Sequence, residues 1–357
     1  MTTLNELVSD PLFQLNTLLW LTQPLPRRAN IRPVLWERGF VVHAIAPQLT
    51  LPPDVRLVLK DSGFPHQDSV RPDVVVRRER DLRYGMVECK GKSFGTQSST
   101  AEQARTLVIA AGPRLAEILG LQPSGTQRSA AAYLVPVSAA PQMRQTLGLL
   151  EEELHSVNMT SGQTCILGLE PASDALFLNS DTPASDFFDL PEPRVAFLIL
   201  EHTNDPRPLY FIPYDPDCCQ SPGEGEYCKR VLFERIQATI LGAAGQAVPP
   251  TDVVFAAEPL LNSAMFGTYG FWENSQSAKH MRRLARELLG KLAEVVSEEV
   301  GGAFAYFENR GWVLRVDDET ARGKICNALS KFSCETMALR QEPQPGLFDD
   351  LVDGQAQ

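Results

Sequence analysis

The sequence lacks most of the short motifs that mark common enzyme classes. Its seven cysteines include no C-x-x-C pair, which favours reduced intracellular thiols; the cluster of Cys218, Cys219 and Cys228 leaves a metal site as the alternative. A G-x-x-x-x-G-K-[ST] loop is absent, so the chain shows no ATPase of its own. The five histidines come without the nucleophile-elbow motif that would support Ser/His/Asp hydrolysis.

Apolar runs long enough to cross a membrane are also missing, and the N-terminus lacks the basic-then-apolar pattern of a secretory signal. Hydrophobic residues make up 43% of the chain and charged residues 22%, which is ordinary for a globular protein. We therefore expect a cytoplasmic protein that does not bind membranes.

Positive charge is scarce overall but unevenly spread. The net charge of −11 has the wrong sign for binding nucleic acid by bulk attraction. Residues 1–170 hold 17 Lys and Arg against 16 Asp and Glu, whereas residues 171–357 hold 16 against 28. Residues 71–114 hold nine basic and five acidic residues, so this segment is locally positive.

Hydrophobic periodicity and turn residues predict alternating strands and helices. Strands are expected at 40–46, 56–59, 73–76, 84–89, 130–137, 164–169, 195–201, 209–212, 303–307 and 312–316. Helices are expected at 5–22, 31–38, 99–119, 141–157, 226–243, 277–300 and 318–332. This order is typical of an α/β layer.

Composition suggests where the chain divides. Residues 170–193 are rich in Ser, Pro, Asp and Ala, so we place a linker at 171–194. It separates a domain at 1–170 from an acidic accessory α/β domain of unknown fold at 195–340. Residues 341–357 are rich in Pro, Gln and Asp, which predicts a disordered acidic tail.

The most informative pattern is a pair of apolar runs with acids at their ends. Asp73 begins the run Val74-Val75-Val76, and a second run ends in Glu88-Cys89-Lys90. Residues i and i+2 of a strand share one face, so Glu88 and Lys90 project together. If the two strands are neighbours, Asp73 joins them. Carboxylates and water are the ligands that Mg²⁺ prefers, so these groups could hydrolyse a phosphodiester.

Pro72-Asp73 followed by Glu88-Cys89-Lys90 resembles the signature of the PD-(D/E)xK nuclease superfamily, which has a restriction-endonuclease-like fold. Members of the branch with Holliday junction resolvases and Mrr-like restriction enzymes carry a Gln in the next helix, where Gln103 stands. Many members also carry an upstream acid. Glu37 is the best candidate here, and Glu6 and Asp10 compete with it. The resemblance covers roughly residues 30–140 and implies a mixed sheet flanked by helices.

The resemblance also implies roles for these residues. Asp73 and Glu88 would bind one or two Mg²⁺ or Mn²⁺ ions, with the backbone carbonyl of Cys89 as a further ligand. Lys90 would position the attacking water, and Gln103 would orient Lys90 or the water. Phosphate contacts position a duplex without reading its sequence. We expect such contacts from four basic residues, which could instead be ordinary exposed charges: Lys92, Arg77, Arg78 and Arg105.

We therefore expect a metal-dependent DNA endonuclease in restriction of foreign DNA or in DNA repair, acting with a protein partner or as a homo-oligomer. One alternative is a non-catalytic module that binds nucleic acid or a partner through the same fold. Another is an acidic adaptor whose motif is accidental.

The tail carries one further pattern. Gln344, Leu347 and Phe348 resemble the short peptide by which bacterial proteins dock on the sliding clamp. A tail of this kind can place two apolar anchors in a groove while the Gln satisfies polar groups at its edge. A plain acidic tail is the alternative.

Overall fold

The computed structural model describes residues 4–25, 30–121, 127–199, 209–216, 218, 222–272 and 276–338. The chain divides into two compact units. Unit 1 comprises residues 1–219 and 261–283, and unit 2 comprises residues 220–260 and 284–357. The predicted boundary at 171–194 is therefore too early, because residues 175–199 add two more strands and a helix to unit 1.

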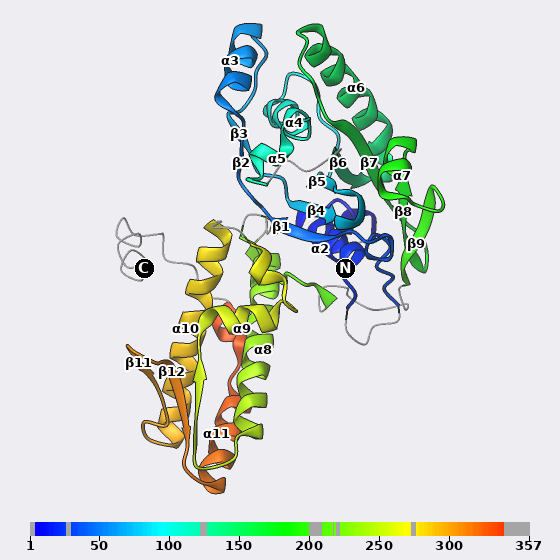
Figure 1. The fold of residues 1–357 in the computed structure, drawn as a ribbon. Coiled ribbons are helices and arrows are strands. Elements are labelled where there is room, and N and C mark those ends of the chain that lie inside the picture. The colour runs from blue at the N-terminus through cyan, green and yellow to red at the C-terminus, as the bar shows by residue number, and fades with distance from the viewer. Residues whose placement is uncertain are drawn as a thin grey trace. The chain divides into compact units, whose positions relative to one another are not determined.

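Unit 1 is built on a seven-stranded sheet with the order β1-β4-β5-β6-β7-β8-β9 (Figure 1). Its strands are β1 (Val41–Ile45), β4 (Val74–Arg78), β5 (Arg83–Cys89), β6 (Arg128–Pro136), β7 (Gln163–Pro171), β8 (Ala175–Ser180) and β9 (Arg194–Ile199). β5, β6 and β7 are parallel, and the other neighbours are antiparallel. The short strands β2 (Leu49–Thr50) and β3 (Ser69–Val70) form a separate pair.

Helices cover both faces of this sheet. The described helices before residue 200 are α1 (Leu4–Leu7), α2 (Pro11–Thr22), α3 (Pro53–Ser62), α4 (Ser99–Ala110), α5 (Leu115–Ile118), α6 (Ala140–Ser156) and α7 (Thr182–Phe188), and the 3-10 turns of unit 1 include η1 (Trp36–Arg38), η2 (Glu79–Asp81), η3 (Val137–Ala139) and η5 (Thr268–Phe271). β5, β6 and β7 are buried along almost their whole length, as expected for parallel strands covered on both faces. α4 and α6 pack on the face that carries Met86 and Tyr133. α2 and α7 contact the other face, where Phe187 lies against Gly85.

The coarse prediction of a mixed α/β fold with helices flanking a mixed sheet is confirmed, but several elements differ. The strand expected at 56–59 is part of helix α3, which begins with Pro53 at its first turn and ends at Gly63, where φ is +75°. Proline is favoured at a helix start and glycine at a left-handed C-cap. The helix expected at 31–38 is only η1, closed by Gly39 as predicted.

Two further differences have clear physical causes. α4 ends at Ala110 instead of continuing to 119, because Gly112 and Pro113 follow it. Residues 210–212 form no strand, because side chains of α2 take up the neighbouring backbone groups. Asn16 exchanges two hydrogen bonds of 2.8 Å with the backbone of Ile212, and Trp20 donates to the carbonyl of Leu209.

Unit 2 combines helices with a three-stranded antiparallel sheet of order β10-β12-β11. The elements after residue 220 are α8 (Pro222–Gln246), β10 (Thr251–Phe255), α9 (Ala257–Ala264), α10 (Gln276–Glu299), β11 (Phe304–Phe307), β12 (Gly311–Val316), α11 (Glu319–Lys331) and α12 (Cys334–Ala338). The division between the units falls inside α9 and α10. The hairpin predicted around Asn309-Arg310-Gly311 is confirmed, with Phe307 paired to Gly311.

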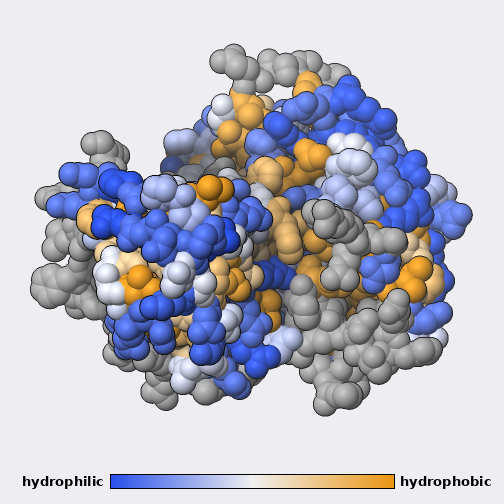
Figure 2. All heavy atoms as spheres, turned by 90° about the horizontal axis from the view of Figure 1, so that it is seen from below, coloured by the Kyte–Doolittle hydropathy of each residue, from blue (hydrophilic) through white to orange (hydrophobic). Residues whose placement is uncertain are grey.

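On the face seen in Figure 2, most of the coloured residues are hydrophilic, and smaller hydrophobic areas lie between them. In the part of the chain that the structure describes, none of the helices has both the length and the apolar character needed to span a membrane. The clamp-like residues Gln344, Leu347 and Phe348 lie outside the described residues.

Candidate metal-dependent active site

Strand pairing brings Asp73 and Glu88 together. β4 and β5 are antiparallel neighbours in which Val74 faces Val87, so Asp73, just before Val74, and Glu88, just after Val87, lie at the same end of the sheet. The backbone N–H of Cys89 donates a 2.6 Å hydrogen bond to Oδ2 of Asp73. The expectation that the two acid-bearing strands are neighbours is therefore confirmed.

Lys90 and Gln103 complete a compact polar cluster with Glu88. Lys90 Nζ lies 2.7 Å from Glu88 Oε1, and Gln103 Nε2 donates to the same oxygen at 3.0 Å. Lys90 Nζ also lies 3.4 Å from Gln103 Oε1. Gln103 reaches the site because α4 begins just after its N-cap Ser98. Four residues singled out from the sequence thus converge.

Burial perturbs the charges of this cluster. The Glu88 side chain is only 6% exposed, and burial together with the nearby charge of Asp73 raises its pKa to about 8. Burial likewise raises the pKa of Asp73, against the Cys89 hydrogen bond and the charge of Lys90. Burial alone would lower the pKa of Lys90, but interactions with Glu88 and Asp73 outweigh it and the net shift is upward. Lys90 is therefore a charged donor beside two acids that resist ionisation.

The donor set fits a hard divalent cation. Asp73 and Glu88 supply carboxylate oxygens, and Glu88 Oε2 is buried without a hydrogen-bond partner. The Cys89 thiol is buried and its pKa is raised well above the usual value by burial and by the neighbouring acids, so it is no thiolate ligand. Among the described residues no group of three or more His, Cys, Asp or Glu could hold a metal, so backbone carbonyl or water oxygens must complete the set.

A buried glutamine, which the sequence reasoning missed, holds the backbone of this site. Gln14 lies fully buried on α2 and donates from Nε2 to the carbonyls of Val8 at 2.8 Å and Lys90 at 3.0 Å. A Cβ on Gly91 would lie 2.4 Å from the carbonyl oxygen of Ser9, so glycine is required for this close approach. The signal available in the sequence was an amide inside an otherwise apolar helical run.

Glu37 is not brought to the site. It forms an ion pair with Arg32 at 2.7 Å. The neighbouring carbonyl of Arg38 accepts from Arg78, at the end of β4 opposite to Asp73. Glu37 therefore cannot serve as the upstream acid. Of its competitors, Asp10 caps α2 by accepting from the N–H of Phe13 at 2.6 Å, and Glu6 lies exposed on α1.

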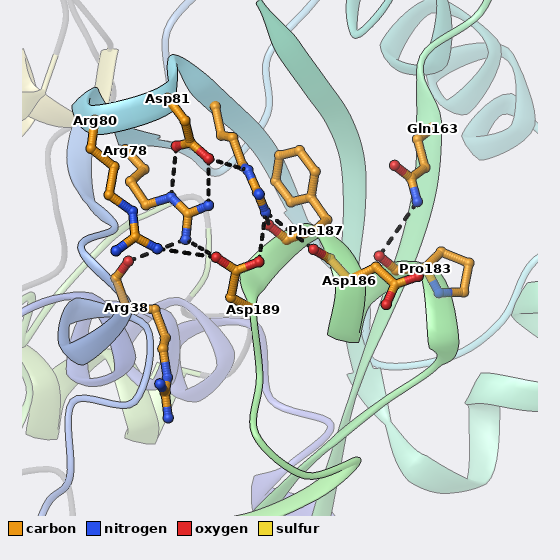
Figure 3. Close-up of polar contacts among 10 residues, drawn as sticks. Arg38, Arg78, Arg80, Asp81, Gln163, Pro183, Asp186, Phe187 and Asp189 are labelled. Atoms are coloured by element: carbon orange, nitrogen blue, oxygen red, sulfur yellow. Dashed lines mark hydrogen bonds and ion pairs between the residues drawn. The ribbon is translucent and has the colours of Figure 1, made fainter.

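Arg78 is not available for a phosphate. Its side chain is 1% exposed, lies over the ring of Phe40 and pairs with Asp81 at 2.6 Å and with Asp189 at 2.5 Å. Figure 3 shows the guanidinium between these two acids, with Arg80 also donating to Asp189. Two residues adjacent in the sequence, Arg77 and Arg78, thus have different surroundings because they point to opposite faces of β4.

Arg105 is also buried, with 2% of its side chain exposed. It pairs with Glu153 and donates to the carbonyls of Pro65 and Thr96, so it ties two loops to α4. Of the two remaining candidates, Arg77 is partly exposed and pairs with Glu79 at the far end of β4. Lys92 is exposed in the loop that follows Lys90, and it is the one predicted phosphate contact placed beside the cluster.

Comparisons with known proteins assign no family. No family model, curated protein or solved structure matches this chain.

Proposed function

We propose that this protein is a metal-dependent endonuclease of the PD-(D/E)xK type that hydrolyses DNA phosphodiesters in restriction of foreign DNA or DNA repair. The convergence of Asp73, Glu88, Lys90 and Gln103 at the end of β5 carries this proposal. The site also lies at the carboxyl end of a parallel strand, where α/β sheets usually bind ligands. A restriction-like fold and a cytoplasmic location belong to the same proposal.

In this proposal Asp73, Glu88 and the carbonyl of Cys89 hold Mg²⁺ or Mn²⁺. A bound cation would neutralise charge on the scissile phosphate and lower the pKa of a coordinated water. Lys90 keeps its proton, so its ammonium group orients the attacking water and the phosphate by donating hydrogen bonds. Gln103 contacts both Glu88 and Lys90 and fixes their separation. Lys92 contacts a backbone phosphate beside the cleaved bond.

The deciding experiment incubates the purified protein with plasmid, linear and branched DNA, and with RNA of matched shape, with Mg²⁺, Mn²⁺ or EDTA. Cleavage that needs the metal and disappears in Asp73→Ala supports the proposal. Asp174→Ala is the matched control, because Asp174 is exposed in the turn between β7 and β8. Metal-independent DNA binding without cleavage would instead identify a non-catalytic module, and no binding at low salt would identify an accidental motif.

A further inference from the structure

A pocket of about 300 Å³ lies in unit 1, two strands away from the candidate active site. It is formed by the segment after β6, the first turn of α6, the middle of β7 and the end of β8, and its lining includes Val137, Ala140, Pro141, Ile166, Gly168 and Asn179. Sites for small molecules occupy about 300–1,000 Å³ and are mostly apolar, with a few polar groups. This pocket is therefore large enough to hold one small planar group.

The strand register places the pocket on the same face of the sheet as Glu88. Glu88 of β5 is in register with Tyr133 of β6, which is in register with Ile166 of β7. Residues in register share a face, and so does Gly168, two positions after Ile166. Two strand spacings correspond to roughly 10 Å. Both places lie toward the carboxyl ends of parallel strands, where α/β sheets bind ligands.

The loop that carries Lys92 connects the two places. Ser93 Oγ donates a 2.7 Å hydrogen bond to Oε1 of Gln142, in the first turn of α6. Thr146, also on α6, donates to the carbonyl of Phe94 at 2.9 Å. The helix that forms one wall of the pocket is thus bonded to the loop that follows the active-site strand.

Gly168 keeps the pocket open. A Cβ added to Gly168 would lie 3.5 Å from Cβ of Asn179 and from Cα of Val137, which is ordinary van der Waals contact. Its backbone is not in the left-handed region either, so neither packing nor conformation requires glycine here. Glycine inside a strand weakens it and often marks a place where a ligand approaches closely.

The charged residues of the pocket neutralise each other. Arg144 pairs with Asp181 and donates to Oγ1 of Thr164 at 2.8 Å. Asn179 donates from Nδ2 to Oε2 of Glu170 at 2.8 Å, and no hydrogen bond reaches its Oδ1 from the described residues. The pocket therefore suits a neutral ligand that brings a donor for this oxygen, and it offers little to a free phosphate.

We propose that this pocket binds a nucleobase with an exocyclic amino group, which donates to Oδ1 of Asn179 while the ring contacts the apolar walls. A nucleotide joins a charged phosphate to a neutral planar base, and the cluster with Lys92 and this pocket match those two parts. The source of the base is the strand being cleaved, extruded from its stack. That source rests on the proposed function, whereas the nucleobase site can be tested without it.

The first test titrates the full-length protein in EDTA with dAMP, dTMP and deoxyribose 5-phosphate by saturation-transfer NMR. We expect saturation transfer to the base protons and about threefold to tenfold weaker binding of dTMP, which lacks the amino group. Asn179→Ala should remove this preference. Gly168→Val, which fills the pocket, should abolish the transfer to the bases, and the base-free sugar phosphate should not bind.

Gly148→Val is the matched control, because Gly148 lies on α6 and its added Cβ would meet no atom within 4 Å. Thermal unfolding checks that each variant is folded, and Ala140→Leu replaces Gly168→Val if that variant is not. Absence of transfer to the bases, or equal transfer in wild type and the filled variant, would overturn the proposal, whether or not the protein cleaves DNA.

The second test identifies the source of the base. Duplex DNA with 2-aminopurine at successive positions is mixed with the protein in EDTA, and fluorescence rises where this amino-bearing base leaves the stack. We expect a rise of at least about twofold at one position, lost in Gly168→Val and kept in Gly148→Val. Nucleotide binding without any such rise would overturn the extruded base and assign the pocket to a free nucleotide. If the protein binds no DNA, the proposed function fails, and the first test alone decides whether the pocket binds nucleobases.

Discussion

Lys90 carries the most direct prediction at the scale of single residues. Lys90→Met keeps the length of the side chain but removes the ammonium group, while the proposed metal ligands Asp73 and Glu88 remain. We expect the cleavage rate to fall at least ~100-fold and Mn²⁺ and DNA binding to stay close to wild type. Steady-state cleavage assays with parallel calorimetry measure this, with Lys331→Met on α11 as the control. Near-normal turnover in Lys90→Met would remove Lys90 from the mechanism.

The raised pKa of Glu88 predicts how the stability of the folded protein depends on pH. Its pKa is raised from 4.5 to about 8 in the folded protein, so the folded state holds the proton more tightly than the unfolded chain. The stabilising contribution of the protonated Glu88 to the free energy of unfolding is therefore fully present below about pH 4.5. It is lost as the pH rises through about 8, by ~1.4 kcal/mol per pH unit. Urea unfolding in EDTA from pH 5 to pH 9 should show this decline, and Glu88→Gln should flatten it. Equal slopes in both proteins would refute the assignment.

Substitution of Gln14 tests whether its hydrogen bonds hold the backbone of the site in place. Gln14→Leu keeps the volume but leaves the carbonyls of Val8 and Lys90 without a donor. We expect a loss of about 1–2 kcal/mol in the free energy of unfolding and a lower kcat with little change in KM, because the backbone at Lys90 is no longer fixed. Asn16→Leu, which breaks the contacts of α2 with Ile212 instead, should lower stability without the selective effect on kcat. Equal kcat values in the two variants would argue against a special role for Gln14.

At the scale of elements, the turn between β4 and β5 is joined to α7 by a network of charges. Asp189, the residue that caps α7, lies 3.0 Å from Arg83 and 2.5 Å from the buried Arg78, and Asp81 pairs with both arginines (Figure 3). Because Arg78 is buried, removal of one acid leaves its charge incompletely paired.

We therefore expect Asp189→Asn to destabilise unit 1 by on the order of 2–3 kcal/mol, less than for a fully buried pair because Asp189 itself is partly exposed. Asp174→Asn, in an exposed turn, should change stability by less than about 0.5 kcal/mol. Chemical denaturation of the whole protein measures both. A negligible effect of Asp189→Asn would show that Asp81 alone is sufficient for Arg78.

At the scale of the whole molecule, charge distribution decides how DNA can bind. The chain carries a net charge of −11, so any affinity must come from local positive residues such as Lys92. Binding should therefore weaken steeply with salt, and Lys92→Ala should reduce the slope of log K against log salt by about one. Fluorescence anisotropy from 50 to 300 mM salt measures this, with Lys331→Ala as the control. A salt-independent affinity would argue against direct phosphate contacts.

The sequence by itself determined the parts of the site that depend on local periodicity. Alternation along a strand placed Glu88 and Lys90 together, and the family resemblance pointed to Gln103 in the helix that follows. Apolar runs identified β4, β5, β6 and β7 as strands. These features depend on residues a few positions apart, so they are visible without knowledge of the fold.

Only the tertiary structure decided which charged residues are available for function. Arg78 looked like a surface charge until Asp189, 111 residues later, was found beside it. Arg105 depends in the same way on Glu153, and Glu37 was excluded by the strand that follows it. The role of Gln14 likewise depends on the carbonyl of Lys90, 76 residues later. Burial and pairing arise from contacts between distant segments, and the residue types alone do not specify those contacts.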